Sequence, residues 1–96
     1  MSTLIREVVL SRRARKEPSS VPRHVATKLL EWVDQVQTSG LEITRARPGY
    51  HDEPLKGRRR EQRSIRLNRA YRAIYVMRDN RALELVSVEE VNKHGY

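Results

Sequence analysis

The chain has 96 residues, a length that one domain accounts for, and we treat residues 1–96 as a single domain. It contains no cysteine, which excludes disulfides, thiolate-bound metals and thiol nucleophiles. Because no apolar run approaches the roughly 18 residues of a membrane-spanning helix, we expect a cytoplasmic protein without a membrane partner. Residues 45–81 hold twelve of the twenty Lys and Arg and four of the twelve acids, so this window carries the whole formal net charge of +8. Charge concentrated in this way indicates a polyanionic partner.

The first half of the chain predicts a strand and two helices. Residues 3–10 are apolar and β-branched enough for a strand, and residues 11–17 indicate a short basic helix. A longer helix follows, with Ser20 as its expected N-cap, Pro22 in its first turn and Gly40 just past its end. Apolar side chains recur along it at helical spacing: Val25, Leu29, Val33 and Val36. This stripe predicts a helix that faces the core.

The second half predicts mostly strands. Residues 41–47 extend the helical region by a turn, and residues 48–57 indicate a loop. Three strands are expected at 62–68, 71–78 and 82–91, joined by connections short enough for hairpins. The middle one is apolar on both faces, which is typical of a central strand. The pattern therefore predicts an α+β domain with helices on one face of a small antiparallel sheet.

Three residues in and beyond the basic window fit the needs of RNA cleavage by its own 2′-hydroxyl, which requires a base, a charge stabiliser and an acid. Glu53 is the candidate base, although a glutamate in a basic loop is more often a simple counter-charge. Arg72 lies inside the most apolar strand, where an unpaired charge is costly to bury. It either pairs with an acid or faces a groove that binds anions. His94 is the natural general acid, since imidazole titrates near neutral pH.

Further basic and aromatic residues are expected to contact RNA rather than to react. Lys56 follows Glu53 closely, and a hairpin brings Arg66 near Arg72, where two cations repel each other unless an anion lies between them. His24 and His51 are weaker candidates. No His, Asp or Glu residues show metal-ligand spacing, so neither a metal nor another cofactor is expected. The expected RNA- and phosphate-binding set is Lys56, Arg58, Arg63, Arg66, Lys93 and Tyr96.

Four motifs stand in a fixed order in the second half: PGYHDEPLKG at 48–57, RSIRL at 63–67, YRAIY at 71–75 and KHGY at 93–96. Together they resemble the RelE/ParE superfamily of bacterial toxins, and most of all its HigB- and YoeB-type mRNA interferases. The resemblance implies an α+β fold with two N-terminal helices packed on a small, curved, mainly antiparallel sheet of about four strands. The N-terminal half matches only in the order of its elements.

The resemblance also implies a function. Such a protein is the toxin of a type II toxin–antitoxin pair, neutralised by a cognate antitoxin. It is a metal-independent endoribonuclease that cleaves mRNA in the A site of the 70S ribosome and so inhibits translation. By this resemblance Glu53 is the base, Arg72 stabilises the scissile phosphate and His94 is the acid. Lys56, Arg66 and Tyr96 fall where such enzymes place supporting contacts to phosphates and bases.

Two alternatives stay open at the level of function. One is a ParE-like inhibitor of DNA gyrase that is not an enzyme, and the other is a plain RNA-binding module. Within the nuclease hypothesis, either Glu53 or Lys56 is the base. Gly95 separates His94 from Tyr96, which are adjacent in the YoeB type, so the register of this ending is also open.

Overall fold

The helices and strands follow the order expected from the sequence. The structure is a computed structural model that describes residues 5–16, 21–78 and 82–90. Its elements are β1 (Glu7–Leu10), α1 (Arg12–Lys16), α2 (Arg23–Ser39), α3 (Leu41–Arg45), the 3-10 turn η2 (Pro48–Tyr50), β2 (Glu53–Pro54), the 3-10 turn η3 (Gly57–Arg59), β3 (Gln62–Arg66), β4 (Tyr71–Met77) and β5 (Ala82–Glu90).

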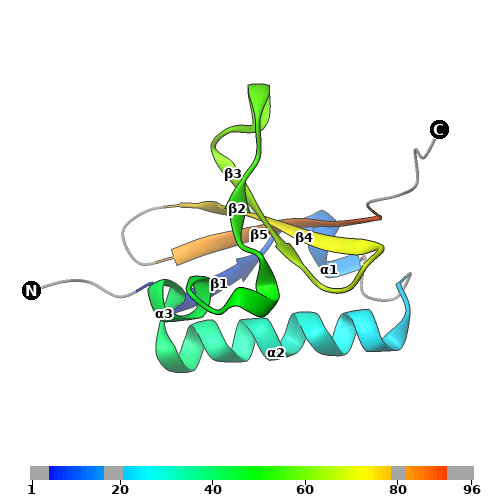
Figure 1. Cartoon of the computed structure of the whole chain (residues 1–96), viewed down its shortest axis with the longest axis horizontal. Coiled ribbons are helices and arrows are strands. Elements are labelled where there is room, and N and C mark those ends of the chain that lie inside the picture. Colours follow the sequence, from blue (N-terminus) through cyan, green and yellow to red (C-terminus); the bar gives the residue numbers. More distant parts are fainter. Residues whose placement is uncertain (1–4, 17–20, 79–81, 91–96) are drawn as a thin grey trace, which may run out of the picture.

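The described strands form one sheet in the order β1-β5-β4-β3-β2 (Figure 1). β1 runs parallel to β5, while the other neighbours are antiparallel. The α+β class is confirmed, and β4 is central as expected, but the sheet has five strands rather than about four. The added strand is β2, which pairs with Ser64 and Arg63 in a segment expected to be a loop. A two-residue strand containing a proline has no readable period, and an edge is where proline is tolerated.

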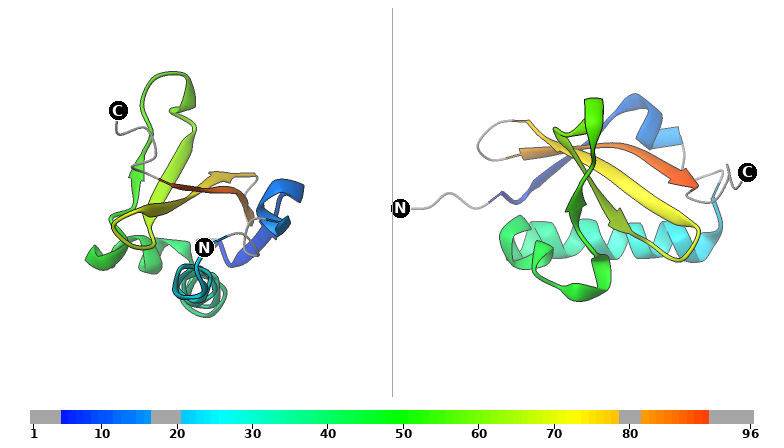
Figure 2. Two further views of the ribbon diagram at one scale, coloured as in Figure 1. Left: turned by 90° about the vertical axis from the view of Figure 1, so that its right-hand side faces the viewer. Right: turned by 45° about the horizontal axis from the view of Figure 1, so that its top comes forward.

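Helix α2 lies along one face of the sheet (Figures 1 and 2). The predicted stripe is confirmed in part, because Val33 is only partly buried and Trp32 takes its place in the core. The Trp32 ring lies 5.3 Å from that of Tyr75 on β4, which joins the helix to the centre of the sheet. Ala14 on α1 and Leu85 on β5 belong to the same buried cluster. The helices therefore cover one face, as expected.

The sequence predicts the C-terminal end of α2 correctly but not its N-terminal end. The N-cap position is Pro22, so the expectation that Ser20 caps the helix is wrong; Ser20 itself lies outside the described residues. The C-terminal end is as predicted. Gly40 adopts φ 92°, a conformation that favours glycine, and its N–H donates to the Val36 carbonyl at 2.8 Å.

Two adjacent leucines of α2 test which side of the helix faces the sheet. Leu29 is 5% exposed and Leu30 is 67% exposed. We expect Leu29→Ala to lower the free energy of unfolding by about 2–5 kcal/mol, because it leaves a cavity in the core. Leu30→Ala should change it by less than about 0.5 kcal/mol. Urea denaturation measures both, and equal losses would contradict the orientation of α2.

Candidate functional site

The pleat of the sheet separates a core face from an open face. Ala73 and Tyr75 on β4 point to the helix side and join the core cluster, so Arg72 and Ile74 point the other way. Side chains directly opposite each other on paired strands share a face. The register aligns Arg72 with Arg66 on β3 and with Glu89 on β5. These three charged side chains therefore form a row across the face that α2 does not cover.

A second row lies next to the first. Ile74 aligns with Ser64 on β3 and Ser87 on β5, and Ser64 aligns in turn with Glu53 on β2. Glu53 is thus placed on the same face as Arg66 and Arg72, one row away. The structure brings together the predicted base, the predicted phosphate-stabilising arginine and a supporting arginine.

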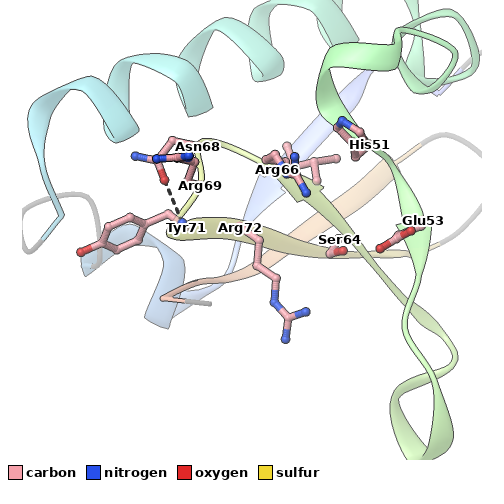
Figure 3. Close-up of a pocket in the computed structure, with 9 residues that line it drawn as sticks. His51, Glu53, Ser64, Arg66, Asn68, Arg69, Tyr71 and Arg72 are labelled. Carbon is pink, nitrogen blue, oxygen red and sulfur yellow. Dashed lines mark hydrogen bonds between the residues drawn. The ribbon is translucent and has the colours of Figure 1, made fainter. Parts of the chain in front are cut away.

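A hollow of about 130 Å³ opens at this place. In Figure 3 the Arg72 side chain extends away from helix α2, and Glu53 points toward Ser64. Three cations and one carboxylate border the hollow, so its charge favours an anion. It is lined by His51, Glu53, Ser64, Ile65, Arg66, Asn68, Arg69, Tyr71 and Arg72.

Arg66 and Arg72 are like charges placed directly opposite each other. Such a pair destabilises a sheet unless an anion lies between the two side chains. Arg66 is exposed and makes no ion pair with any described residue. An anion such as a phosphate, whose oxygens match the planar fork of a guanidinium, would relieve this repulsion.

Arg72 itself is held from the other side. Its Nη2 donates to Glu89 Oε1 at 3.2 Å, while Glu89 Oε2 accepts from Arg59 Nη2 at 2.8 Å and from Ser87 Oγ at 3.2 Å. Burial disfavours the charged form of Glu89, but the hydrogen bonds from Arg59 and Arg72 outweigh it and lower the pKa of Glu89. Of the two possibilities for Arg72, both are realised: it pairs with an acid and it borders the hollow.

A buried ion pair on the core side fixes β2. The Asp52 side chain is 1% exposed, and it accepts hydrogen bonds from Arg63 Nε at 2.6 Å and Tyr75 Oη at 2.5 Å. Because successive residues of an extended chain point to opposite sides, tying Asp52 to the core face directs Glu53 to the open face. Tyr50, buried in η2 beneath Lys28, anchors the chain just before this point.

The charges of this buried cluster shift the ionisation of its members. Burial raises the pKa of Tyr75, and the hydrogen bond to Asp52 adds to the effect. For Arg63, burial opposes the charge, but Asp52 outweighs it and raises the pKa further. Arg63 was expected to bind RNA phosphates. It lies on the core side, aligned with Tyr75 across the strands and bonded to Asp52, and it does not line the hollow.

Two of the remaining predicted residues, Lys56 and Arg58, do not line the hollow. They are exposed in the connection between β2 and β3. Lys93, His94 and Tyr96 lie outside the described residues.

His51, a weaker candidate in the sequence analysis, is one of the residues at the hollow. It adopts φ 47° at the end of η2, turns the chain into β2 and lines the hollow. A signal existed, since His51 stands two residues before Glu53, and histidine is among the residues enriched at positive φ. His24 does not line the hollow; it lies 3.1 Å from Asn68 Nδ2, and Asn68 Oδ1 accepts from the backbone N–H of Tyr71 to close the β3–β4 turn.

Among the described residues, no three His, Asp or Glu side chains gather closely enough to hold a metal ion. The described helices are all too short or too polar to cross a bilayer.

Two arginines of β3 should respond to substitution in opposite directions. Arg66→Gln removes the repulsion with Arg72, and we expect it to raise the free energy of unfolding by about 0.2–1 kcal/mol, less at high salt. Arg63→Gln leaves the buried Asp52 carboxylate without its cation and should cost about 3–5 kcal/mol. Urea denaturation at low and high salt measures both. A loss of stability on Arg66→Gln would argue against an unpaired Arg66.

The raised pKa of Tyr75 predicts a loss of stability in alkali. Unfolded tyrosine loses its proton near pH 10, whereas folded Tyr75 keeps it to higher pH, so the unfolded state gains stability as the pH rises above about 10. Tyr75→Phe removes this contribution. We expect curves of melting temperature against pH over that range to fall more steeply for the wild-type chain than for Tyr75→Phe. Parallel curves would show that Tyr75 does not titrate as described.

No protein-family profile matches the chain, and no curated protein matches it in sequence. Solved structures do match its fold. YafQ from Escherichia coli strain BL21(DE3) has a TM-score of 0.70 at 17% identity, over 88% of this chain and 92% of YafQ. The YoeB dimer from Staphylococcus aureus gives 0.64 at 17% identity, over 86% of this chain and 93% of that one. The archaeal RelE–RelB complex from Pyrococcus horikoshii OT3 gives 0.68 at 18% identity, over 97% and 99%.

At identities this low, the structural similarity establishes the fold alone. The activity has to be argued from the site. The likeness nevertheless spans nearly the whole length of each chain, including the N-terminal half in which the sequence shows no shared motif. At the level of the fold the expectation is confirmed: the chain has the fold seen in the solved structures of YafQ, YoeB and RelE.

Proposed function

We propose that this chain is the toxin of a toxin–antitoxin pair and that it cleaves mRNA on the ribosome. The observation that carries the proposal is the placement of Glu53, Arg66 and Arg72 on one open face of the sheet, around a single hollow. A structural role does not require an Arg66 that is unpaired among the described residues, an Arg72 bound on one side by Glu89 and an exposed carboxylate to converge there. The fold shared with YafQ, YoeB and RelE supports the same function.

In the proposed reaction, Glu53 accepts the proton of a ribose 2′-hydroxyl. The 2′-oxygen forms a bond to the adjacent phosphorus, and the bond from phosphorus to the 5′-oxygen breaks. Arg66 and Arg72 bind the phosphoryl oxygens and stabilise the charge that develops on them. A proton passes to the departing 5′-oxygen. The products are a 2′,3′-cyclic phosphate and a 5′-hydroxyl end.

The proton donor has two candidates. His94 is the one expected from the sequence; it follows the end of β5 by four residues, and that end aligns with Tyr71 beside Arg72. His51 lines the hollow directly. An imidazole can donate a proton from a ring nitrogen, so either histidine suits the role.

The proposed partners follow from charge and from fold. The connection between β2 and β3 carries Lys56 and Arg58, which are both exposed, and we propose that they contact ribosomal RNA phosphates around the A site. The RelE of Pyrococcus horikoshii is known in complex with RelB. By analogy we propose that an antitoxin binds this chain and neutralises it.

The test is to add the purified chain to a translation reaction and to map the 5′ ends of the mRNA. We expect new 5′-hydroxyl ends at positions within codons. Arg72→Ala should slow cleavage by about 10²–10³-fold, because it removes a fixed charge from the transition state. Glu53→Gln should slow it by about 10²–10⁴-fold. Arg78→Ala is the matched control, since Arg78 follows the same strand but does not line the hollow.

The same reaction decides between the histidines and between the functions. Loss of cleavage in His94→Gln with full cleavage in His51→Gln assigns the acid to His94, and the reverse result assigns it to His51. If the wild-type chain leaves mRNA intact in translating and idle extracts, the nuclease proposal fails. Inhibited DNA supercoiling by gyrase would then favour the ParE-like function.

A further inference from the structure

Glu89 is a carboxylate at the edge of the site to which the reaction assigns no task. It is aligned with Arg72 on the neighbouring strand and lies on the same open face. Its side chain is 23% exposed, and its oxygens accept three hydrogen bonds, from Arg59, Arg72 and Ser87. Such a degree of engagement is unusual for a surface acid, which normally keeps much of its hydration.

The hydrogen bonds around Glu89 lead from Arg59 and Ser87, through the carboxylate, to Arg72. The guanidinium of Arg59 makes two hydrogen bonds. Its Nε donates to Gln62 Oε1 at 3.0 Å, and its Nη2 donates to Glu89 Oε2. Ser87 is buried on the same strand as Glu89 and donates to the same oxygen, Oε2. One oxygen of the carboxylate is thus fixed by two donors, which leaves the other, Oε1, facing Arg72.

Arg72 is held by one edge only. Its Nη2 reaches Glu89 Oε1, while Nε is buried and has no hydrogen-bond partner among the described residues. An arginine side chain carries about 2 kcal/mol of rotamer entropy, which a free Arg72 would have to lose on binding a phosphate. Contact with Glu89 removes this freedom beforehand and leaves the N–H groups of the guanidinium other than the buried Nε for the substrate.

We propose that Glu89, held by Arg59 and Ser87, is the positioning residue that orients Arg72 toward the scissile phosphate. The proposal rests on the nuclease function proposed above. It predicts an effect on the chemical step rather than on RNA affinity, because Glu89 repels phosphate and aids the reaction only through the geometry of Arg72. A carboxylate that merely competed with substrate for Arg72 would act in the opposite direction, and its removal would tighten binding and quicken cleavage.

The test compares Glu89→Gln with Glu84→Gln in single-turnover cleavage of ribosome-bound mRNA. Glu84 is a matched control: it lies on the same strand, is also 23% exposed and pairs with Arg78 at 3.0 Å, away from the hollow. We expect Glu89→Gln to lower the cleavage rate at saturating protein by about 10- to 100-fold, with the half-saturating concentration little changed. Glu84→Gln should match the wild-type chain. Cleavage by Glu89→Gln at the wild-type rate or faster would overturn the proposal.

A second readout does not depend on cleavage. The Nε–H of Arg72 can be followed by NMR and assigned with Arg72→Lys. We expect Glu89→Gln to shift this signal and to speed its exchange with solvent, whereas Glu84→Gln leaves it in place. An unmoved signal overturns the positioning role. A wild-type chain that cleaves nothing, with the signal shifted as expected, instead refutes the proposed function.

Arg59→Gln guards against a Glu89 variant that fails to fold. It loosens Glu89 without touching Arg72, so it should slow cleavage in the same sense but less. In a double-mutant cycle the two substitutions should not add, since Arg59 acts through Glu89. Additive losses would show that Arg59 contacts RNA by itself, which would contradict the network.

Discussion

The site depends on the buried contact of Asp52 with Arg63 and Tyr75. β2 is two residues long and could not hold its place by backbone pairing alone. Asp52 supplies the missing attachment, because a carboxylate that is 1% exposed can leave its two donors only at the cost of an unpaired charge in the core. The alternation of the chain then places Glu53 on the opposite side. Glu53, the candidate base, is thus exposed to substrate, while the contacts of the neighbouring Asp52 fix its position.

The open face carries more positive charge than the fold requires. Glu89 offsets part of the charge of Arg72 and Arg59, but among the described residues no acid pairs with Arg66. Repulsion between Arg66 and Arg72 is therefore left in the folded protein and can be relieved by a bound anion. Such repulsion lowers the stability of the folded protein. It is expected at positions where residues are selected for function and not for stability. The buried pair on the other face shows how the same strand accommodates an arginine whose role is structural.

Much of this arrangement could be read from the sequence, and the failures have physical reasons. The strand expected at 62–68 is present as β3, with Ile65 facing the core and Arg66 the opposite side. Alternation along β3 also puts Arg63 on the core side, although it is among the residues expected from the sequence to bind phosphate. Glu89 gave no signal, because its partner Arg72 meets it through the register of β4 with β5, and Arg59 reaches it from the connection between β2 and β3, 30 residues away in the sequence. Contacts of this kind depend on register, which a bulge near Tyr75 also alters.

The direction of β5 bears on how the reaction could be completed. Glu89 aligns with Arg72, and residue 94 is five positions beyond Glu89 in the sequence. Five residues span at most about 17 Å when fully extended, which limits the distance between the Cα atoms of residues 89 and 94. If His94 is the acid, it has to reach the scissile phosphate within that limit. His51 lines the hollow from a turn held by Tyr50 and β2. The two candidate acids therefore differ in their place in the sequence, since His51 precedes Glu53 by two residues and His94 follows β5. Only with His51 as the acid would the base, the cations and the acid all lie among the described residues.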